Sequence, residues 1–481
     1  MLELSSLHWG AIALAADWAI RLVMLPVVPT RRSPEAAKGW LLLIFFLPWV
    51  GLIAYLLIGR PRLPRWRLAR LRQFTQQAQA HATVRLALPG SGAVTPAPPA
   101  VAGPYQASQR LATDLAQLPN LGGNDVKLLT DYAQIFERVV ADIDAARSTV
   151  HVCFYIFADD AATQPVLQAL GRATARGVRC RVLVDAFGSR PYAPRLLPRL
   201  HELGVDARKA LPFRWRKPAS RLDLRNHRKI VVIDGRIGYA GSQNMVSPTF
   251  KPGLTYSELV ARIEGPTALQ LQGVFAADWF AETAEFVGVD AFPAPQSNGP
   301  CPAQILPNGP ASATQRAQRM VVNLVYAAQR RVCITTPYFI PSQSLQEAME
   351  TAAQRGVQVH LIVDHRKDQF MVANAQRSYY ESLLTAGVQI HAYREAFLHT
   401  KAVSVDGEVA WVGSCNMDMR SFDLNEEVIA LFFNREIATK LEALETAYMR
   451  GSERVELDAW RRRPFSEQLV QNLTRLVSPL L

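Results

Sequence analysis

Two segments of the sequence carry the same reactive side chains at the same spacing. The first, NHRKIVVIDGRIGYAGSQN, covers residues 226–244, and the second, LHTKAVSVDGEVAWVGSCN, covers residues 398–416. In each, a histidine lies two residues before a lysine, an Asp-Gly pair begins five residues after that lysine, and Gly-Ser-x-Asn closes the segment. A single motif of this kind is weak evidence, but two copies with one layout indicate a functional site.

The spacing predicts how these side chains are held. Alternate residues of a strand project to the same side, so His227 shares a face with Lys229, and His399 shares one with Lys401. The sequences IVVID and AVSVD predict strands, and the Asp-Gly pairs predict tight hairpin turns. The returning strand of each hairpin then brings Gly-Ser-x-Asn back towards the histidine and the lysine.

Each copy therefore supplies an imidazole, an ammonium, a hydroxyl and an amide, a set that suits a phosphoryl group. Lysine and asparagine can neutralise and hydrogen bond the non-bridging phosphate oxygens. One imidazole can attack phosphorus, while the other protonates the departing alkoxide and then deprotonates the incoming hydroxyl. The phosphate-binding candidates are Lys229, Lys401, Ser242, Asn244, Ser414 and Asn416.

The sequence predicts neither a metal nor another cofactor. There is no H-E-x-x-H motif, and the two lysines can take the role of a cation at the phosphate. The five cysteines are widely spaced without a C-x-x-C pair, which indicates neither a disulfide framework nor a zinc site. Cys415 lies inside the second motif and is assigned no role, although partial exposure there would make it sensitive to oxidation.

The two motifs belong to a larger internal repeat. Residues 145–157 (AARSTVHVCFYIF) resemble residues 327–339 (AAQRRVCITTPYF), and residues 175–185 (ARGVRCRVLVD) resemble residues 354–364 (QRGVQVHLIVD). Alternating helical and strand patterns are typical of α/β layers. The fold class expected is therefore α/β, with two similar domains at residues 111–291 and 313–481, a connecting segment at 292–312, and the active site at their interface.

The first 60 residues predict a membrane hairpin. Residues 39–58 are 20 uncharged, mainly apolar residues, which is enough to cross a bilayer core of about 30 Å. Residues 7–29 contain Asp17 and Arg21 at a spacing that lets them pair, and predict a second span or, alternatively, an interfacial or re-entrant helix. More arginines follow the hairpin than lie within it, so the positive-inside rule places the rest of the chain in the cytoplasm.

Two further segments bear on the membrane. Residues 61–110 are basic and rich in Pro and Ala, which predicts a linker. The net charge of +12 favours a polyanionic partner, such as an anionic membrane surface, a phosphate ligand or nucleic acid. Near the C-terminus, apolar residues recur at helical spacing, which predicts an amphipathic helix that packs on the core or, alternatively, lies on a membrane. These residues are Phe465, Leu469, Val470, Leu473, Leu476, Val477 and Leu480.

The paired motifs match the duplicated H-x-K-x4-D signature of the phospholipase D superfamily. Within it, the sequences TTPYF, GSCNMDMRSFDLNEEV and GWLLLIFFLPWVGLIAYLLIGR resemble those of bacterial cardiolipin synthases, and the likeness extends from about residue 17 to the terminal SPLL. The resemblance implies phosphatidyl transfer between two phosphatidylglycerol molecules, giving cardiolipin and glycerol through a phosphohistidine. It also implies a multi-pass protein of the bacterial inner membrane, with anionic phospholipids as partners.

The resemblance also implies roles for the histidines. His227 would be the nucleophile and His399 the general acid and then base, although the sequence pattern alone leaves the reverse assignment open. We expect a bell-shaped pH profile, with one neutral and one protonated imidazole in the free enzyme. Lys229 and Lys401 would bind the phosphate.

The acidic residues of the family pattern complete the candidate catalytic set. Glu258 and Glu427 lie where the family places residues that orient the histidines, and Glu426 competes with Glu427 for this role. Asp234 and Asp406 belong to the signature, but we expect them to hold a turn or an ion pair without contacting substrate.

Two other functions use the same residues. Water in place of the lipid acceptor would make the protein a phosphodiester hydrolase of the phospholipase D type, and superfamily members also cleave DNA. The membrane anchor argues against a nucleic-acid partner, as does the absence of an evident basic and aromatic strip for single strands. Donor and acceptor preference, acyl-chain selectivity and oligomeric state are not encoded in these motifs.

Overall fold

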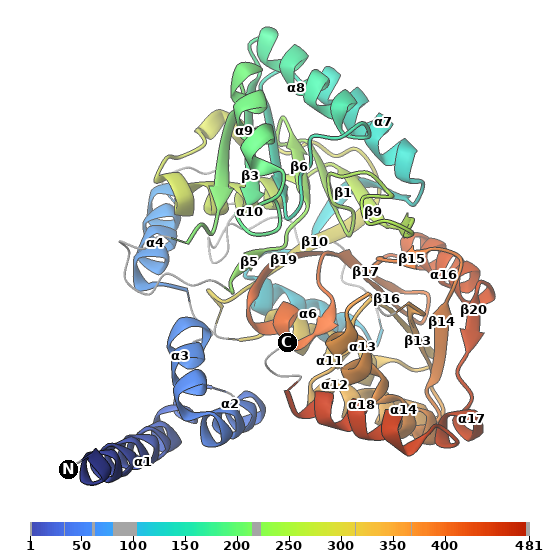
Figure 1. The fold of residues 1–481 in the computed structure, drawn as a ribbon. Helices are drawn as coiled ribbons and strands as arrows, with labels where there is room; N and C mark the ends of the chain where they lie inside the picture. Colours follow the sequence, from blue (N-terminus) through green and yellow to red (C-terminus); the bar gives the residue numbers. More distant parts are fainter. Residues whose placement is uncertain are drawn as a thin grey trace.

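The computed structural model shows two halves stacked on one continuous sheet, with the N-terminal helices projecting from one side (Figure 1). The first half is drawn mainly in green and the second in orange and red, and strands β10 and β19 lie between them. The residues described are 2–32, 34–59, 63–79, 103–213, 223–312, 314–366 and 368–477.

The sheet contains 16 strands within these residues: 15 form one continuous order, and the short β5 (Arg225–Asn226) pairs with β19 beside it. The two halves have the same strand order, apart from β20 at the outer edge of the second. The first half runs β1 (Leu121–Leu129), β9 (Val260–Glu264), β7 (Ile237–Gly241), β6 (Ile230–Ile233), β2 (Thr149–Phe154), β3 (Arg179–Asp185) and β4 (Asp206–Ala210). The second half runs β10 (Cys301–Asn308), β19 (Asn425–Phe432), β17 (Val409–Gly413), β16 (Ala402–Val405), β11 (Arg331–Thr335), β13 (Gln358–Asp364), β14 (Gln389–Tyr393) and β20 (Ser452–Arg454). Because β1 pairs antiparallel with β10, the halves are related by a near-twofold arrangement about this central pair.

Helices cover both faces of each half. In the first, α7 (Tyr132–Asp144) follows the antiparallel strand β1, and α8 (Gln164–Ala175) and α9 (Ala193–Glu202) follow β2 and β3 in the parallel part of the sheet. The long α10 (Ala268–Thr283) is almost entirely buried. In the second, α11 (Arg316–Ala327), α12 (Gln343–Gln354) and α14 (Tyr380–Ala386) correspond to the first three, and α16 (Arg435–Arg450) corresponds to α10. The α/β fold class expected from the repeat is thus confirmed.

The two motif hairpins form as predicted. Strands β6 and β7 pair antiparallel around Asp234-Gly235, and β16 and β17 pair around Asp406-Gly407. All four turn residues have positive φ angles, between 52° and 68°, which is the backbone shape that Asp-Gly favours in tight hairpins.

The predicted span over residues 39–58 is wrong as a single helix. The structure breaks it into α2 (Pro34–Phe46) and α3 (Pro48–Ile58), which fold back so that the rings of Trp40 and Tyr55 lie 5.3 Å apart. Pro48 lacks the N–H needed to continue the helix, and its ring would clash with the carbonyl of residue 44. Gly51 then permits close packing, because a side chain there would meet Ile44.

Among the described helices, the one long and apolar enough to cross a membrane is instead the first. Helix α1 (Leu2–Val27) contains an 18-residue apolar window, Gly10–Val27, of which 6% is buried within the protein. Asp17 and Arg21 lie within 3.9 Å of each other, as their spacing predicted. Helices α2 and α3 have 13 and 11 residues, so each is at most about 20 Å long and too short to span alone.

The segment predicted as a linker contains two docked helices, while its residues 80–102 lie outside those described. Helix α4 (Arg65–Gln79) packs on α10, where Arg67 forms a buried, two-pronged ion pair with Glu282. Helix α6 (Gln106–Ala116) packs against α11 and β10, so it joins the core of the second half although it precedes the first in sequence.

The C-terminal helix α18 (Phe465–Val477) packs on α13 (Phe370–Arg377) with its polar face. Gln471 and Thr474 are buried, whereas Phe465, Leu469 and Leu473 are 77%, 46% and 54% exposed. The predicted amphipathic helix therefore exists, but its apolar stripe faces away from the core.

Candidate active site

The two motif histidines line one cavity between the halves. It has a volume of about 500 Å³, and His227, Asn244, His399 and Asn416 all contribute to its wall. Each histidine residue is 8% exposed. The predicted convergence of the two motifs on a shared site is therefore present in the structure.

Short strands that pair across the halves place each histidine. Strand β5 (Arg225–Asn226) leads into His227 and pairs in parallel with the start of β19, so that the His227 N–H donates to the Glu426 carbonyl at 2.8 Å. Strand β15 (Phe397–Leu398) leads into His399 and pairs with β8 (Tyr256–Ser257), where the His399 N–H donates to the Ser257 carbonyl at 2.9 Å.

As a result of this pairing, each histidine is oriented by a glutamate from the other half. The Nδ1 atom of His227 lies 3.0 Å from both carboxylate oxygens of Glu427 in the second half. Conversely, Nδ1 of His399 lies 2.8 and 2.9 Å from those of Glu258 in the first half. Because a carboxylate can only accept, Nδ1 carries the proton and Nε2 is left for substrate.

Of the two competing glutamates, Glu427 is the one beside a histidine. The Glu426 carboxylate instead accepts a hydrogen bond from Arg228 Nη2 at 2.8 Å, and Arg228 also pairs with Asp278. The position of Arg228 in the other half is occupied by Thr400, whose hydroxyl lies 3.0 Å from that of Tyr448. The near-twofold symmetry therefore breaks directly beside the histidines.

The motif serines contact glutamate, which differs from the phosphate-binding role expected for them. The Ser242 hydroxyl donates to Glu258 at 2.5 Å, and the Ser414 hydroxyl donates to Glu427 at 2.5 Å. Both serines are fully buried. The serine hydroxyls thus position the glutamate carboxylates, which in turn orient the histidines, and they do not line the cavity themselves.

The lysines and asparagines of the motifs lie closer to the cavity. Lys229 Nζ donates to the carbonyl of His227 at 2.7 Å, and Lys401 Nζ donates to that of His399 at 2.5 Å. Asn244 and Asn416 line the cavity, and the side-chain oxygen of Asn244 accepts from the Ile156 N–H at 3.2 Å. Each ammonium retains two N–H donors for a phosphate.

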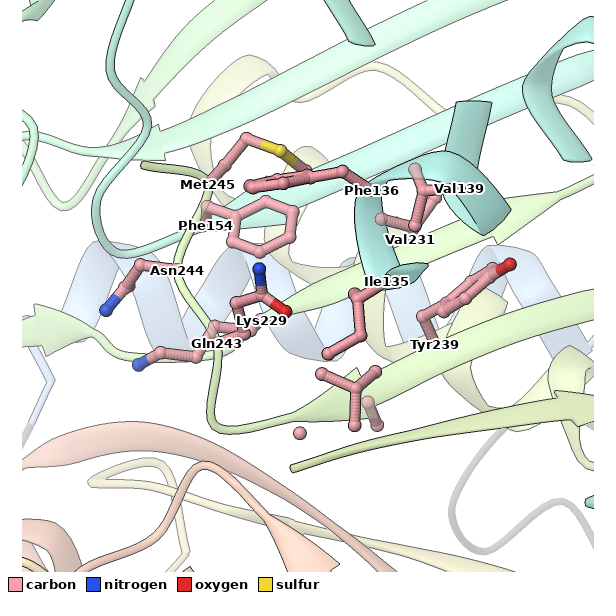
Figure 2. A pocket seen from close by; sticks show the side chains of 13 residues that line it. Ile135, Phe136, Val139, Phe154, Lys229, Val231, Tyr239, Gln243, Asn244 and Met245 are labelled. Carbon is pink, nitrogen blue, oxygen red and sulfur yellow. The ribbon is translucent and has the colours of Figure 1, made fainter. Parts of the chain in front are cut away.

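An apolar hollow behind Lys229 explains part of its environment. It is small, about 20 Å³, and Ile135, Phe154 and Val231 lie in its wall together with Lys229 and Asn244 (Figure 2). This surface cannot solvate an ammonium, so it contributes to the desolvation of the Lys229 side chain.

Burial sets the protonation of the site. Desolvation, opposed by the attraction of the paired glutamate, lowers the pKa of His227 and of His399 to about 4. It also lowers the pKa of Lys229 to about 7 and that of Lys401 to about 8. Burial alone would raise the pKa of Glu427, but His227 and Lys229 hold it below its ordinary value.

These pKa values correct one expectation from the sequence. We expected one neutral and one protonated imidazole in the free enzyme, whereas burial leaves both neutral at pH 7. Two lysines and two glutamates surround the imidazoles, and their charges cancel while both lysines are protonated, which requires a pH below about 7. A bound phosphodiester adds one negative charge and thereby favours a proton on one of the imidazoles.

The aspartates of the signature lie at the turn end of each hairpin, beyond the strand that begins after the lysine. Asp234 accepts hydrogen bonds from the backbone of residues 147–149, and Asp406 accepts them from residues 329–331 and from the Tyr105 hydroxyl. Each carboxylate thus ties its hairpin to the start of the neighbouring strand, β2 or β11.

Replacing Asp406 by asparagine should reduce stability without removing activity. The amide turns one acceptor into a donor that faces backbone N–H groups, at a cost of about 1–3 kcal/mol. We expect a lower midpoint of thermal unfolding for the detergent-solubilised protein, with kcat/KM of the folded fraction within a few-fold of wild type. Loss of activity at an unchanged unfolding temperature would instead place Asp406 in the chemistry.

Cys415, which lies within the second motif, is fully buried, and its thiol contacts the Asn416 carbonyl. The partial exposure expected for it is therefore wrong, because the residue faces the core of the second half. Burial also raises the pKa of this thiol, which disfavours the reactive thiolate.

Several cavity residues were not found from the sequence. The ring of Tyr155 lies edge-on to His227, with centroids 4.8 Å apart, and that of Tyr256 lies edge-on to His399 at 5.4 Å. Arg225 and Arg420 also line the cavity. The repeat gave no signal for Tyr155, since the alignment of residues 145–157 with 327–339 places Pro337 opposite it.

Comparisons with known proteins place the chain in a family. The family model described as "Cardiolipin synthase, PLD-like domain" matches residues 139–279 and 321–445, and "Phospholipase D-nuclease N-terminal" matches residues 13–60. Cardiolipin synthase A of Pectobacterium carotovorum is 33% identical over 95% of this chain and 96% of its own length. The chain belongs to the cardiolipin synthase family. Cardiolipin synthase A of Proteus mirabilis is 34% identical, with the same coverage of both chains.

The fold also matches a solved structure outside this family. The crystal structure of phosphatidylserine synthase from Haemophilus influenzae Rd KW20 superposes with a TM-score of 0.60, at 14% identity. The match covers 78% of this chain and all of the other. At this identity the similarity concerns the fold of the two halves.

Proposed function

We propose that this cardiolipin synthase family member transfers a phosphatidyl group from one phosphatidylglycerol to another, giving cardiolipin and glycerol. The observation that carries the proposal is the pair of histidines from opposite halves in one cavity, each held at Nδ1 by a glutamate of the other half. This arrangement leaves two Nε2 atoms for one phosphodiester.

In the first step, Nε2 of His227 attacks phosphorus and the bond to the departing glycerol oxygen breaks. His399, protonated once the phosphodiester is bound, gives its proton to that oxygen, so glycerol leaves neutral. The phosphatidyl group is then bonded to His227, whose Nδ1–H remains on Glu427. The ammonium groups of Lys229 and Lys401 stabilise the charge on the non-bridging oxygens.

In the second step, the terminal hydroxyl of a second phosphatidylglycerol attacks the same phosphorus. Neutral His399 takes the hydroxyl proton, the new P–O bond forms, and the P–N bond to His227 breaks. One phosphodiester has replaced another, and both imidazoles return to their starting protonation.

The pKa values predict where activity is lost on the alkaline side. The ammonium form of lysine binds phosphate and disappears as the pH rises, so kcat/KM should fall through about pH 7–8, where Lys229 and Lys401 titrate. The alkaline decline of kcat should occur at higher pH than that of kcat/KM, because bound phosphodiester stabilises the ammonium form of the lysines. The pH dependence of both constants tests this, and a kcat/KM that stays level to pH 10 would contradict it.

We also propose how the protein sits at the bacterial inner membrane. Helix α1 would cross the bilayer once, the α2–α3 hairpin would enter the cytoplasmic side, and the arginines of α4 would keep the two halves in the cytoplasm. The outward apolar stripe of α18 supports contact with the bilayer surface.

The deciding experiment supplies purified protein with phosphatidylglycerol alone, without cytidine nucleotide or added metal. We expect cardiolipin and glycerol in equal amounts. Phosphatidic acid as the main product would show that water traps the intermediate, making the protein a hydrolase. A salt-dependent DNA complex without lipid turnover would show a nucleic-acid function instead.

A further inference from the structure

Two arginines in the cavity wall have no part in the mechanism described above. Arg225 lies on β5 in the first half, and Arg420 lies on α15 (Met419–Asp423) in the second. The Arg225 guanidinium lies 3.7 Å from the centre of the Phe187 ring, and Arg420 donates to the backbone carbonyl of Asp223. Both side chains therefore line the cavity at the seam between the halves, as the histidines do.

Tyr155 relates these arginines to the reaction centre. One side of its ring packs edge-on against His227, and its hydroxyl interacts with Arg225 and with the charge of Arg420. The Arg225 guanidinium thus lies at the hydroxyl end of the Tyr155 ring, and the Arg420 charge acts on the same hydroxyl from the opposite half.

Charges of both signs surround the two guanidinium groups. Arg225 and Arg420 repel each other and partial burial weakens the solvation of Arg225, whereas Asp185 and Asp223 attract Arg225. The nearby Asp185 carboxylate accepts hydrogen bonds from the backbone N–H groups of Phe187, Gly188 and Asn226, and Asp418 caps α15 by accepting from the Ser421 N–H. A planar guanidinium binds a phosphate through two parallel hydrogen bonds, so two of them form a strong phosphate site.

We propose that Arg225 and Arg420 bind the phosphodiester of the acceptor lipid. This inference rests on the proposed function and adds to it, because transfer requires two phosphates in the cavity at once. While the acceptor hydroxyl attacks phosphorus on His227, its own phosphate lies a three-carbon glycerol bridge away. The arginine pair stands on the far side of Tyr155, where this second phosphate falls.

The subsite also selects the acceptor. In this arrangement the arginines hold the phosphate of the acceptor and not the reacting phosphate, so the first step does not depend on them. The contribution of the subsite is to hold an anionic alcohol in place of water or a neutral alcohol at the second step. The bonds that form and break are those given above, with the hydroxyl proton passing to His399.

The test compares two acceptors in the full-length protein reconstituted in phosphatidylglycerol vesicles. One reaction is cardiolipin formation, and the other is incorporation of labelled free glycerol into phosphatidylglycerol, which uses the same donor and a neutral acceptor. For Arg225→Gln and Arg420→Gln we expect cardiolipin formation to fall about 10- to 100-fold, the loss typical of one hydrogen bond to a charged group. Glycerol incorporation should stay within about threefold of wild type.

Two further variants sharpen the comparison. Arg225→Lys keeps the charge and should recover part of the cardiolipin rate, whereas Arg172→Gln, an exposed residue paired with Asp144, should change neither reaction. A parallel fall of both reactions, or no change in either, would overturn the acceptor subsite. Failure of the wild-type protein to make cardiolipin would instead refute the proposed function.

Discussion

The His227→Ala and His399→Ala variants should each lose lipid transfer by about 10⁴-fold or more, because either change removes a group that bonds to phosphorus or moves the essential proton. The two losses should differ in kind. With a p-nitrophenyl ester of phosphatidic acid as donor, the leaving group needs no proton, so the first step no longer requires the acid. We expect His399→Ala to release one p-nitrophenolate per active site in a burst and then stall, and His227→Ala to give no burst.

Stopped-flow absorbance measures the burst, and mass spectrometry of the quenched protein locates the phosphatidyl group on the peptide containing residue 227. The reversed pattern, with a burst from His227→Ala alone, would exchange the two roles. A burst from both variants would contradict a mechanism with a single nucleophile. The Asp406→Asn variant serves as control, since its carboxylate contacts backbone at the far end of the hairpin.

Much of this site follows from the sequence because its cause is local. Asp-Gly pairs impose the hairpins, and alternation along a strand places histidine and lysine on one face. The repeat required two α/β halves, and the structure pairs β1 with β10 at their centre. The convergence of two such motifs in one cavity follows from the near-twofold arrangement.

The crossing of the glutamates could not be derived in this way. The sequence pattern identifies Glu258 and Glu427 as candidates but does not show which histidine each contacts. Glu258 lies in the same half as His227 but contacts His399, and Glu427 lies in the same half as His399 but contacts His227. The partnership depends on short parallel pairings, β5 with β19 and β15 with β8, between segments about 140 to 200 residues apart. Local pattern contains no information on which half supplies the partner.

The N-terminal segment shows a different limit. The apolar composition of residues 39–58 predicts one helix in spite of Pro48, because membrane helices tolerate proline when neighbours satisfy the freed backbone groups. Here Gly51 allows the chain to fold back on itself, so the break becomes a tight turn between α2 and α3. The outward orientation of the apolar stripe of α18 could not be predicted either, because periodicity identifies an apolar face but not what packs against it.

The crossed glutamates lead to the second large effect. Glu427→Gln and Glu258→Gln keep the shape of the side chain but remove the charge that stabilises a positively charged imidazole, so each should reduce transfer on the order of 10²- to 10⁴-fold. Surface variant Glu408→Gln, which loses an exposed pair with Arg435, should leave the rate unchanged. Steady-state cardiolipin synthesis measures all three.

The burst assay shows which histidine each glutamate serves. Because Glu427 holds His227, Glu427→Gln should slow the burst itself, since phosphatidylation makes this imidazole cationic. Because Glu258 holds His399, Glu258→Gln should keep a near-normal burst and slow the following turnover, where His399 must accept a proton. If each glutamate acted within its own half, the two phenotypes would be exchanged. Each half by itself would then contain a complete histidine–glutamate pair, whereas the crossed arrangement makes both steps depend on the interface between the halves.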